Sequence, residues 1–328
     1  MPEIFDALPG LEAPLGSLGR SLAQMWEDTA AHGQPAPPSD DAKATQVNFV
    51  LHLGMDTDPD DASEQFQTVV RFSRRYPCRV VVLCPEREGA EQAEIKAKVY
   101  GECTLGKTKG DTRCCEFVML NYSHPARPFL ESQVSTCLST DLPLYYWAHR
   151  FSQPARLANY KYLLTRSRRV LFDSAVATED TFTYPWPHPE AVRDLAYARL
   201  LPVRQSLGQF LSRYPMDAIC EGLSGVSVGN GSALAAEGKV MLSWLKDRIA
   251  KCGRNRAAFS IAQAPNLPSA GLCVDFDYGG EKTFHWEGDT AGGSATFIAD
   301  FGAGRTQLSA TASLLSPEGA LSEAMFFD

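Results

Sequence analysis

Two apolar stretches on either side of an amphipathic segment decide the fold: residues 47–53 have the sequence VNFVLHL, and residues 78–84 have the sequence CRVVVLC. The first alternates as a strand does, and the second is continuously apolar, as in a strand buried on both faces. Between them, residues 58–76 place apolar side chains at helical spacing, with acids in the first turn and arginines near the end. This unit predicts parallel strands covered by a helix.

The segments that follow extend the same pattern. Residues 93–103 and 112–121 predict two antiparallel strands around a turn rich in glycine and lysine. Further helices are predicted at 127–139 and 154–165, and further strands at 142–148 and 169–172. Strands that alternate with helices indicate a mostly parallel sheet with both faces covered, to which the hairpin is added.

The second half of the chain has a different texture. Helices are predicted at 190–201, 202–214 and 231–252, and a strand at 216–228. From residue 257 onward, short alternating segments punctuated by glycine predict an antiparallel meander. The predicted fold class is therefore α/β, with an N-terminal mixed, mostly parallel sheet covered by helices and a C-terminal α+β domain that contains an antiparallel meander.

Proline-rich segments suggest the domain boundaries. Residues 1–40 are predicted to form an N-terminal helix, at 17–31, and a Pro-rich linker. Three prolines lie within 185–189, so the N-terminal α/β domain is predicted at 41–184 and the C-terminal domain at 185–328.

Composition excludes several classes of protein. The chain has 328 residues, 44% of them hydrophobic, and a net charge of −8, which argues against disorder and against a nucleic-acid partner. No apolar run approaches the ~20 residues of a membrane-spanning helix, and acids stand where a signal peptide has Lys or Arg. Nine irregularly spaced cysteines do not suggest a disulfide framework. We therefore expect a cytoplasmic protein with reduced thiols and no membrane partner.

Two glycine-rich turns could bind a phosphate. The segment Gly101–Thr108 matches the P-loop pattern, but no helix is predicted after it to complete a phosphate site, so a hairpin turn is the preferred interpretation. The segment Gly225–Gly231 leads into a predicted helix and is interpreted as a tight turn capped by Asn230 or Ser232. A role for this second turn in anion binding stays open.

Catalytic and metal-binding patterns are weak. Asp56, Asp58 and Asp60 resemble the start of a calcium loop, but Asp61 stands where that loop needs glycine, and the acids are better explained as a helix start. The sequence contains no Cys-x-x-Cys, and no two histidines lie four residues apart. We therefore predict no catalytic residue, no cofactor and no metal.

Four blocks carry a resemblance to a known family. They are residues 76–83 (YPCRVVVL), 141–147 (DLPLYYW), 169–174 (RVLFDS) and 194–204 (DLAYARLLPVR). In this order and spacing they resemble the glucose-6-phosphate dehydrogenase assembly protein family, OpcA. The chain departs from the family pattern at Ala148, where a second aromatic residue is usual, and at Val203, where tryptophan is common.

The resemblance implies a non-catalytic regulatory protein. Such a protein binds and allosterically activates, or assembles, glucose-6-phosphate dehydrogenase in the oxidative pentose phosphate pathway. Large aromatics and arginines are the residues most able to supply binding energy at an interface, although core packing is the simpler explanation for any single aromatic. The candidate partner-binding residues are Asp141, Tyr145, Tyr146, Trp147, Asp173, Arg199 and Arg204. The alternative is a nucleotide- or sugar-phosphate-binding enzyme that uses the Gly101–Thr108 or the Gly225–Gly231 turn.

Overall fold

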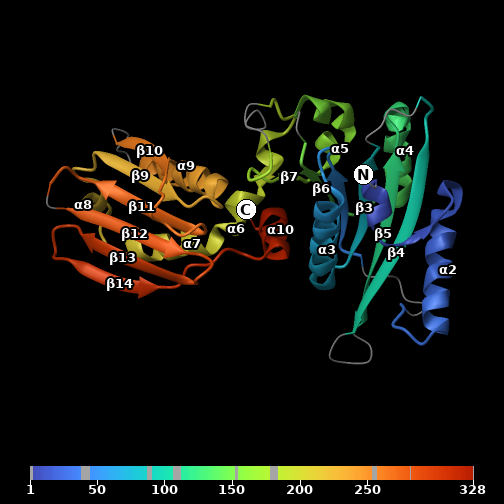
Figure 1. Cartoon of the computed structure of the whole chain (residues 1–328), viewed down its shortest axis with the longest axis horizontal. Coiled ribbons are helices and arrows are strands. Elements are labelled where there is room, and N and C mark those ends of the chain that lie inside the picture. Colours follow the sequence, from blue (N-terminus) through green and yellow to red (C-terminus); the bar gives the residue numbers. More distant parts are fainter. Residues whose placement is uncertain are drawn as a thin grey trace. The chain divides into compact units, whose positions relative to one another are not determined.

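The chain forms two compact units (Figure 1), each with its own sheet. The first unit comprises Met1–Asp194 and Ala324–Asp328, and the second comprises Leu195–Glu323. The structure is a computed structural model that describes residues 3–37, 45–86, 91–105, 112–151, 154–177, 184–252, 257–280 and 282–327. The domain boundaries expected from the sequence, after residues 40 and 184, stay predictions.

The central strand–helix–strand unit is confirmed. Strand β2 (Val47–Leu53) leads through α3 (Pro59–Arg75) to β3 (Cys78–Pro85), and the two strands pair in parallel. The helix begins at Pro59 because the Asp58 carboxylate accepts a hydrogen bond of 2.8 Å from the Asp61 amide, which satisfies a free donor of the first turn. These acids are therefore a helix start, as predicted.

The first sheet is mixed and mostly parallel, as predicted. Its strand order is β1-β4-β5-β3-β2-β6-β7-β8, and every neighbouring pair from β5 to β8 is parallel. Strand β4 pairs antiparallel with β5, and these two strands form the predicted hairpin. Strand β4 also pairs antiparallel with β1, which forms one edge of the sheet. The remaining strands are β1 (Leu11–Glu12), β4 (Ile95–Leu105), β5 (Thr112–Tyr122), β6 (Leu144–His149), β7 (Arg169–Phe172) and β8 (Val192–Asp194).

Helices cover both faces of this sheet (Figure 1). On one face, α3 packs its aromatic residues on the strands, with Phe72 against Phe49 and Phe66 against Phe117. A separate core on the other face includes residues from α2, α4 and α5. The bounds of the covering helices are α1 (Ile4–Ala7), α2 (Leu18–Ala31), α4 (Arg127–Cys137) and α5 (Lys161–Arg166), with a 3₁₀ segment at Pro154–Tyr160. Strand β2 is consequently buried along its whole length.

The second unit contains a six-stranded sheet in the order β10-β9-β11-β12-β13-β14. The strands β11 to β14 form the predicted antiparallel meander, whereas β10 pairs in parallel with β9. The elements are α6 (Leu195–Arg199), α7 (Leu201–Leu211), α8 (Met216–Cys220), β9 (Gly225–Asn230), α9 (Ala235–Lys251), β10 (Ala258–Gln263), β11 (Gly271–Asp277), β12 (Thr283–Asp289), β13 (Ser294–Asp300), β14 (Thr306–Ala310) and α10 (Pro317–Phe326). Apolar side chains of α7 and α9 pack on one face of this sheet.

Three local predictions were wrong. The stretch 190–201, predicted as helix, includes strand β8, because Val192–Asp194 pairs with β7 and this distant partner outweighs local preference. The predicted strand 216–228 is instead α8 followed by β9, with Gly222 at φ +78° in the turn between them. The end of the chain forms α10 rather than more of the meander.

Candidate functional site

The predicted aromatic strand lies in the core of the first unit. Tyr145, Tyr146 and Trp147 in β6 are 2%, 0% and 3% exposed. Neighbouring side chains of a strand point to opposite faces, and both faces are covered here, so all three are buried. Tyr145 packs on Phe326, with ring centroids 5.6 Å apart. The strand therefore acts first as a packing element, and any role of these residues in partner binding stays a prediction.

The two candidate aspartates lie at opposite ends of the sheet. Asp141 is exposed in the turn before β6, and Asp173 follows the last residue of β7. The Asp173 carboxylate accepts a hydrogen bond of 2.9 Å from the Ala175 amide and so shapes the turn. The structure does not bring these two side chains together.

The two candidate arginines lie in the second unit, and each is held by its neighbours. Arg199 donates from Nε to the buried Glu237 carboxylate at 2.7 Å. The Arg204 guanidinium lies 3.6 Å from the centre of the Tyr197 ring and donates to the Tyr197 carbonyl. Contacts within the second unit thus fix the position of both guanidinium groups, and both residues are half-buried.

A different group of polar side chains gathers at the carboxyl ends of the parallel strands. From β2 the chain first builds one side of the sheet, through β3 and β5, and then returns to build β6, β7 and β8 on the other side. The carboxyl ends of strands at such a change of direction are where open α/β sheets bind ligands. Here the end of β2 is followed by Gly54 and Met55, and the end of β6 by Arg150 and Phe151.

A buried histidine organises this edge. His52 of β2 hydrogen-bonds from Nδ1 to the Tyr146 hydroxyl (2.8 Å) and from Nε2 to the Tyr122 hydroxyl (2.7 Å). The Tyr122 hydroxyl is in turn 2.7 Å from that of Tyr160. Burial, with the nearby charge of Arg127, lowers the pKa of His52 to about 3, so the imidazole is neutral near pH 7.

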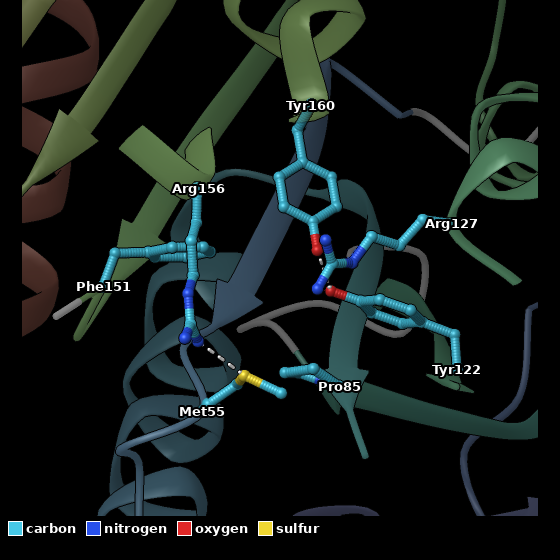
Figure 2. A pocket seen from close by; sticks show the side chains of 7 residues that line it. All are labelled: Met55, Pro85, Tyr122, Arg127, Phe151, Arg156 and Tyr160. Atoms are coloured by element: carbon cyan, nitrogen blue, oxygen red, sulfur yellow. Dashed lines mark hydrogen bonds between the residues drawn. The ribbon is translucent and has the colours of Figure 1, made fainter. Parts of the chain in front are cut away.

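This chain of hydrogen bonds reaches a small pocket, shown in Figure 2. A cavity of about 20 Å³ is lined by Met55, Pro85, Tyr122, Arg127, Phe151, Arg156 and Tyr160. The Arg127 side chain points toward the two tyrosine hydroxyls, and the Arg156 guanidinium donates to the Met55 sulfur at 2.9 Å. Two cations and no carboxylate belong to the lining that the structure describes.

An ion-paired cluster lies beside the pocket. The Asp61 carboxylate accepts hydrogen bonds from His149 (2.8 Å) and Arg150. Burial raises the pKa of Asp61, but its interactions with His149, Gln65 and Arg150 outweigh this effect, so the pKa lies well below its usual range. Arg150 has a φ of 50°, and a Cβ on Gly54 would lie 2.0 Å from the Arg150 carbonyl oxygen. Gly54 is therefore required for the ends of β2 and β6 to meet.

The P-loop match has a structural explanation. Gly101 lies within β4, and an added Cβ there would come 2.4 Å from Met25 and Trp26 of α2, so glycine permits the helix to pack. Thr112, the first residue of β5, pairs with Leu105, and the segment that follows the turn is strand rather than helix. The rest of the match, residues 106–108, lies outside the described residues. The described part therefore lacks the helix that a phosphate-binding P-loop uses.

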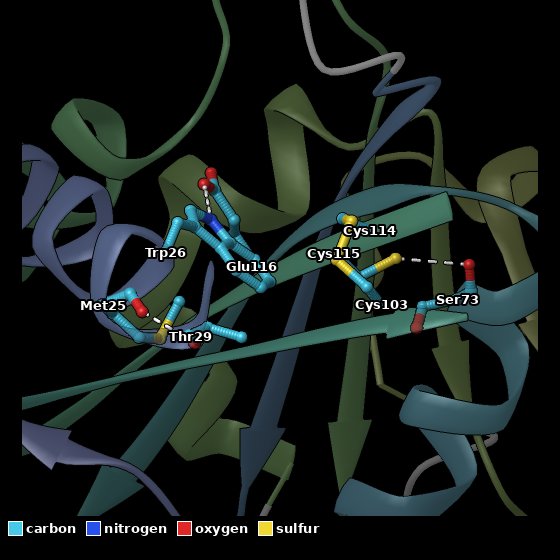
Figure 3. The surroundings of a disulfide bond; sticks show 8 residues. All are labelled: Met25, Trp26, Thr29, Ser73, Cys103, Cys114, Cys115 and Glu116. Carbon is cyan, nitrogen blue, oxygen red and sulfur yellow. Dashed lines mark hydrogen bonds between the residues drawn. A yellow bond between two sulfur atoms is a disulfide. The ribbon is translucent and has the colours of Figure 1, made fainter. Parts of the chain in front are cut away.

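A disulfide joins the two strands of this hairpin, between Cys103 and Cys114 (Figure 3). Cys115 lies on the opposite face, where its thiol donates to the Ser73 carbonyl at 3.2 Å. The expectation that the thiols are reduced is wrong for the Cys103–Cys114 pair. The opposite orientation of adjacent residues 114 and 115 agrees with their predicted place in a strand.

The second glycine-rich turn also has a packing explanation. A Cβ on Gly229 would lie 2.5 Å from the Cys273 sulfur, and one on Gly231 would lie 2.1 Å from the Pro268 carbonyl oxygen. The following helix begins after Leu234 and has no side-chain cap, so the predicted capping by Asn230 or Ser232 is wrong. The Asn230 amide donates instead to the Gly231 carbonyl at 2.9 Å.

The described residues also show neither a metal-binding cluster nor a membrane-spanning helix. They contain no group of three or more His, Cys, Asp or Glu side chains that could hold a metal ion. No helix among them is both long and apolar enough to span a membrane.

The pocket was not predicted from the sequence. Its parts come from four distant segments, and local spacing gives no sign that His52, Tyr122 and Tyr160 meet. One available signal was the histidine itself, because His52 lies between Leu51 and Leu53 in a strand expected to be buried, and a buried imidazole needs hydrogen-bond partners.

Comparison with known proteins gives one family and two relatives. The family profile described as the glucose-6-phosphate dehydrogenase subunit N-terminal domain (OpcA_G6PD_assem) matches residues 69–184. An OxPP cycle protein OpcA of Synechocystis sp. is 23% identical over 179 residues, which cover 53% of this chain and 37% of that protein. A protein of the same description from Synechococcus elongatus is 27% identical over 169 residues, or 51% and 37%.

The matched part thus spans little more than a third of the length of each relative. The profile covers three of the four sequence blocks in full, including the buried aromatic strand, and the fourth block, 194–204, lies beyond it. The resemblance of this chain to the OpcA family, predicted from those blocks, is confirmed.

Proposed function

We propose that this chain binds glucose-6-phosphate dehydrogenase and promotes its assembly and activity as a non-catalytic, regulatory protein. The observation that carries the proposal is the match of residues 69–184 to a domain described as part of a glucose-6-phosphate dehydrogenase subunit. The two relatives are described as proteins of the OxPP cycle, which supports the same pathway. The proposal requires no cofactor, nucleic acid or membrane, and it assigns the protein to the cytoplasm.

Allosteric activation follows if the chain binds one state of the dehydrogenase more tightly than another. The difference between the two affinities limits the shift in population that it can cause. We propose that the more accessible candidates, Asp141, Asp173, Arg199 and Arg204, contact the dehydrogenase. The buried aromatics Tyr145, Tyr146 and Trp147 would support that surface through the core.

The test uses this chain and the glucose-6-phosphate dehydrogenase of the same organism, both purified. Co-elution on size-exclusion chromatography measures binding, and the rate of NADP reduction at limiting glucose 6-phosphate measures activation. We expect a complex and a higher rate at low substrate. Co-elution without a kinetic change would reduce the role to assembly, and the absence of both effects would contradict the proposal.

A matched pair of variants tests the proposed surface. Arg204→Gln removes a guanidinium that lies over Tyr197, and Arg213→Gln removes one that lies 5.8 Å from the Phe210 ring centre in the same unit. Truncation of an interface arginine often costs about 2 kcal/mol of binding. We therefore expect weaker binding for Arg204→Gln alone. Equal binding by both variants would remove Arg204 from the interface.

A further inference from the structure

The pocket at the carboxyl ends of β2, β3 and β5 has the chemistry of an anion site. Its lining includes Arg127 and Arg156 but no described carboxylate. Arg127 makes no hydrogen bond or ion pair to another described residue, and its Nε is buried without a partner. A buried donor without an acceptor is costly, so this guanidinium favours the arrival of an acceptor from solution. The net charge of −8 makes such a local concentration of cations notable.

Counting protons in the buried network adds a donor. Three hydroxyls and a neutral imidazole carry four protons, and the three hydrogen bonds between them use three. Tyr146 is 0% exposed, and within the described part of the chain its hydroxyl has His52 as its hydrogen-bond partner. Its proton therefore goes to Nδ1, and Nε2–H donates to Tyr122.

The fourth proton is then left at the other end of the network. One hydroxyl proton joins Tyr122 to Tyr160, and the remaining one belongs to whichever of the two tyrosines does not use its proton in that bond. Both tyrosines line the pocket. Whichever arrangement is present, an O–H faces the pocket and can donate to an acceptor bound there.

The dimensions define what can bind. The inner cavity of about 20 Å³ is large enough for one water or one oxygen of a ligand. Arg127 also lines a second, more open hollow of about 380 Å³ with His124, Pro125, Pro128 and Asn159. An elongated ligand could thus place one anionic oxygen against the tyrosines and extend past Arg127 into a hollow with polar side chains.

We propose that this pocket binds the phosphoryl group of a small phosphate ester. Arg127 and Arg156 neutralise the charge, Tyr160 or Tyr122 donates a hydrogen bond to one oxygen, and the organic part of the ligand lies in the outer hollow beside His124 and Asn159. Arginine guanidinium groups match phosphate oxygens in geometry as well as charge. The site is separate from the glycine-rich turns and does not depend on the proposed binding of a dehydrogenase.

Isothermal titration calorimetry of the full chain at constant ionic strength tests the proposal. The probes are inorganic phosphate, glucose 6-phosphate and unphosphorylated glucose. We expect the two phosphates to compete for one site, with glucose 6-phosphate bound more tightly, and glucose not to bind. Absence of saturable binding by both phosphates, or binding of glucose equal to that of its phosphate, would overturn the proposal.

Variants locate the site. Arg127→Gln should weaken phosphate binding about tenfold or more, because it removes a charged hydrogen bond. Tyr160→Phe, which keeps the ring, should weaken it less. Arg166→Gln, an exposed arginine of α5 outside the lining, serves as the control and should bind as the unchanged chain does. Thermal unfolding without ligand checks that each variant is folded, and unchanged affinity in folded Arg127→Gln would contradict the assignment.

Discussion

The two sheets of this protein bury their side chains in different ways. In the first sheet, β2 is buried at every position and β3 at all but one. In the second sheet, β9, β12 and β13 alternate strictly between buried and more exposed positions. Helices on both faces cause the first pattern, and helices on one face cause the second.

The difference determines where each unit can meet a ligand or partner. The first sheet can offer its strand ends, its loops, its edge strands and its covering helices, since the side chains of its central strands β2 and β3 are enclosed. The second sheet also offers a whole face, on which Asp275, His285 and Glu287 gather in an ion-paired cluster. Consecutive aromatic residues on a central strand of the first sheet are therefore all buried. On a strand of the second sheet, one of two consecutive aromatic residues would be buried and the next would be more exposed.

The largest effect is expected from the core aromatics. Tyr146→Ala should lower the free energy of unfolding by about 3–5 kcal/mol, and Trp147→Ala, at the next position, by a similar amount. In the second sheet, Phe297→Ala should be as costly, but its neighbour Thr296→Ala should change stability by less than ~0.5 kcal/mol. Urea unfolding monitored by circular dichroism measures all four. A small effect for either Tyr146→Ala or Trp147→Ala would contradict the two-sided burial of β6.

Each unit also buries a glutamate against an arginine, and the two pairs should respond differently. Arg199→Met leaves the Glu237 carboxylate, 4% exposed, without its ion-pair partner, and should cost about 3 kcal/mol. Arg79→Met should cost less, because the indole of Trp26 still donates to Glu116 at 2.9 Å and Arg79 is 34% exposed. The double variant Arg199→Met/Glu237→Met should regain most of the loss. Equal losses in the two single variants would contradict this ranking.

The disulfide of the first unit should contribute somewhat less. Replacement of Cys103 and Cys114 by alanine should destabilise the chain by about 2 kcal/mol, since the bond reduces the conformational entropy of the unfolded chain. The control is Cys252→Ala, a half-buried free cysteine of the second unit. Alkylation of the denatured, unreduced protein followed by mass spectrometry should modify seven cysteines, which are the free ones in the structure. Modification of nine would show that the bond is absent.

The smallest effect concerns a histidine of the open face. His285 donates a hydrogen bond to the Asp275 carboxylate, and this bond raises the pKa of His285. The stabilisation is therefore complete below the ordinary pKa of 6.5 and is lost as the pH rises through the raised value. His285→Gln should cost less than ~1 kcal/mol because the pair is partly exposed.

The buried His52 should show the opposite behaviour. Its pKa is lowered to about 3, so the stability that it contributes is present above 6.5 and declines as the pH falls from 6.5 toward 3. Imidazole ¹⁵N NMR should show His285 titrating above pH 6.5 and His52 not titrating between about pH 5 and 8. A midpoint for His52 near its ordinary value would contradict its burial.

The sequence predicts best where a segment needs no distant partner to be recognised. Strand β3 is too continuously apolar to be anything but a buried element, and α3 carries its own cap and periodicity. Strand β8 has three half-buried residues and no such local pattern. It becomes a strand because it pairs with β7, and that pairing cannot be recognised from the segment alone. The meander was predictable for the same reason as β3, since alternation and glycine turns are local signals.

The candidate pocket could not be predicted in this way. Tyr122, Tyr146 and Tyr160 are separated by other elements, and they meet His52 only when the strand order and register are known. The predicted interface residues were chosen for residue type. Residue type does not distinguish an interface aromatic from a core aromatic, and the aromatic residues of β6 are in fact buried.

The return of residues 324–328 to the first unit bears on how the chain folds during synthesis. Phe326 packs on Phe72, Tyr76 and Tyr145, all from elements that leave the ribosome long before it does. Until the intervening second unit has been translated, the surface formed by Phe72, Tyr76 and Tyr145 lacks the ring of Phe326 that covers it in the folded chain. A nascent chain stalled after Asp194 should therefore be a substrate for chaperones, and a gene fragment cut at that point would express a first unit that lacks this covering.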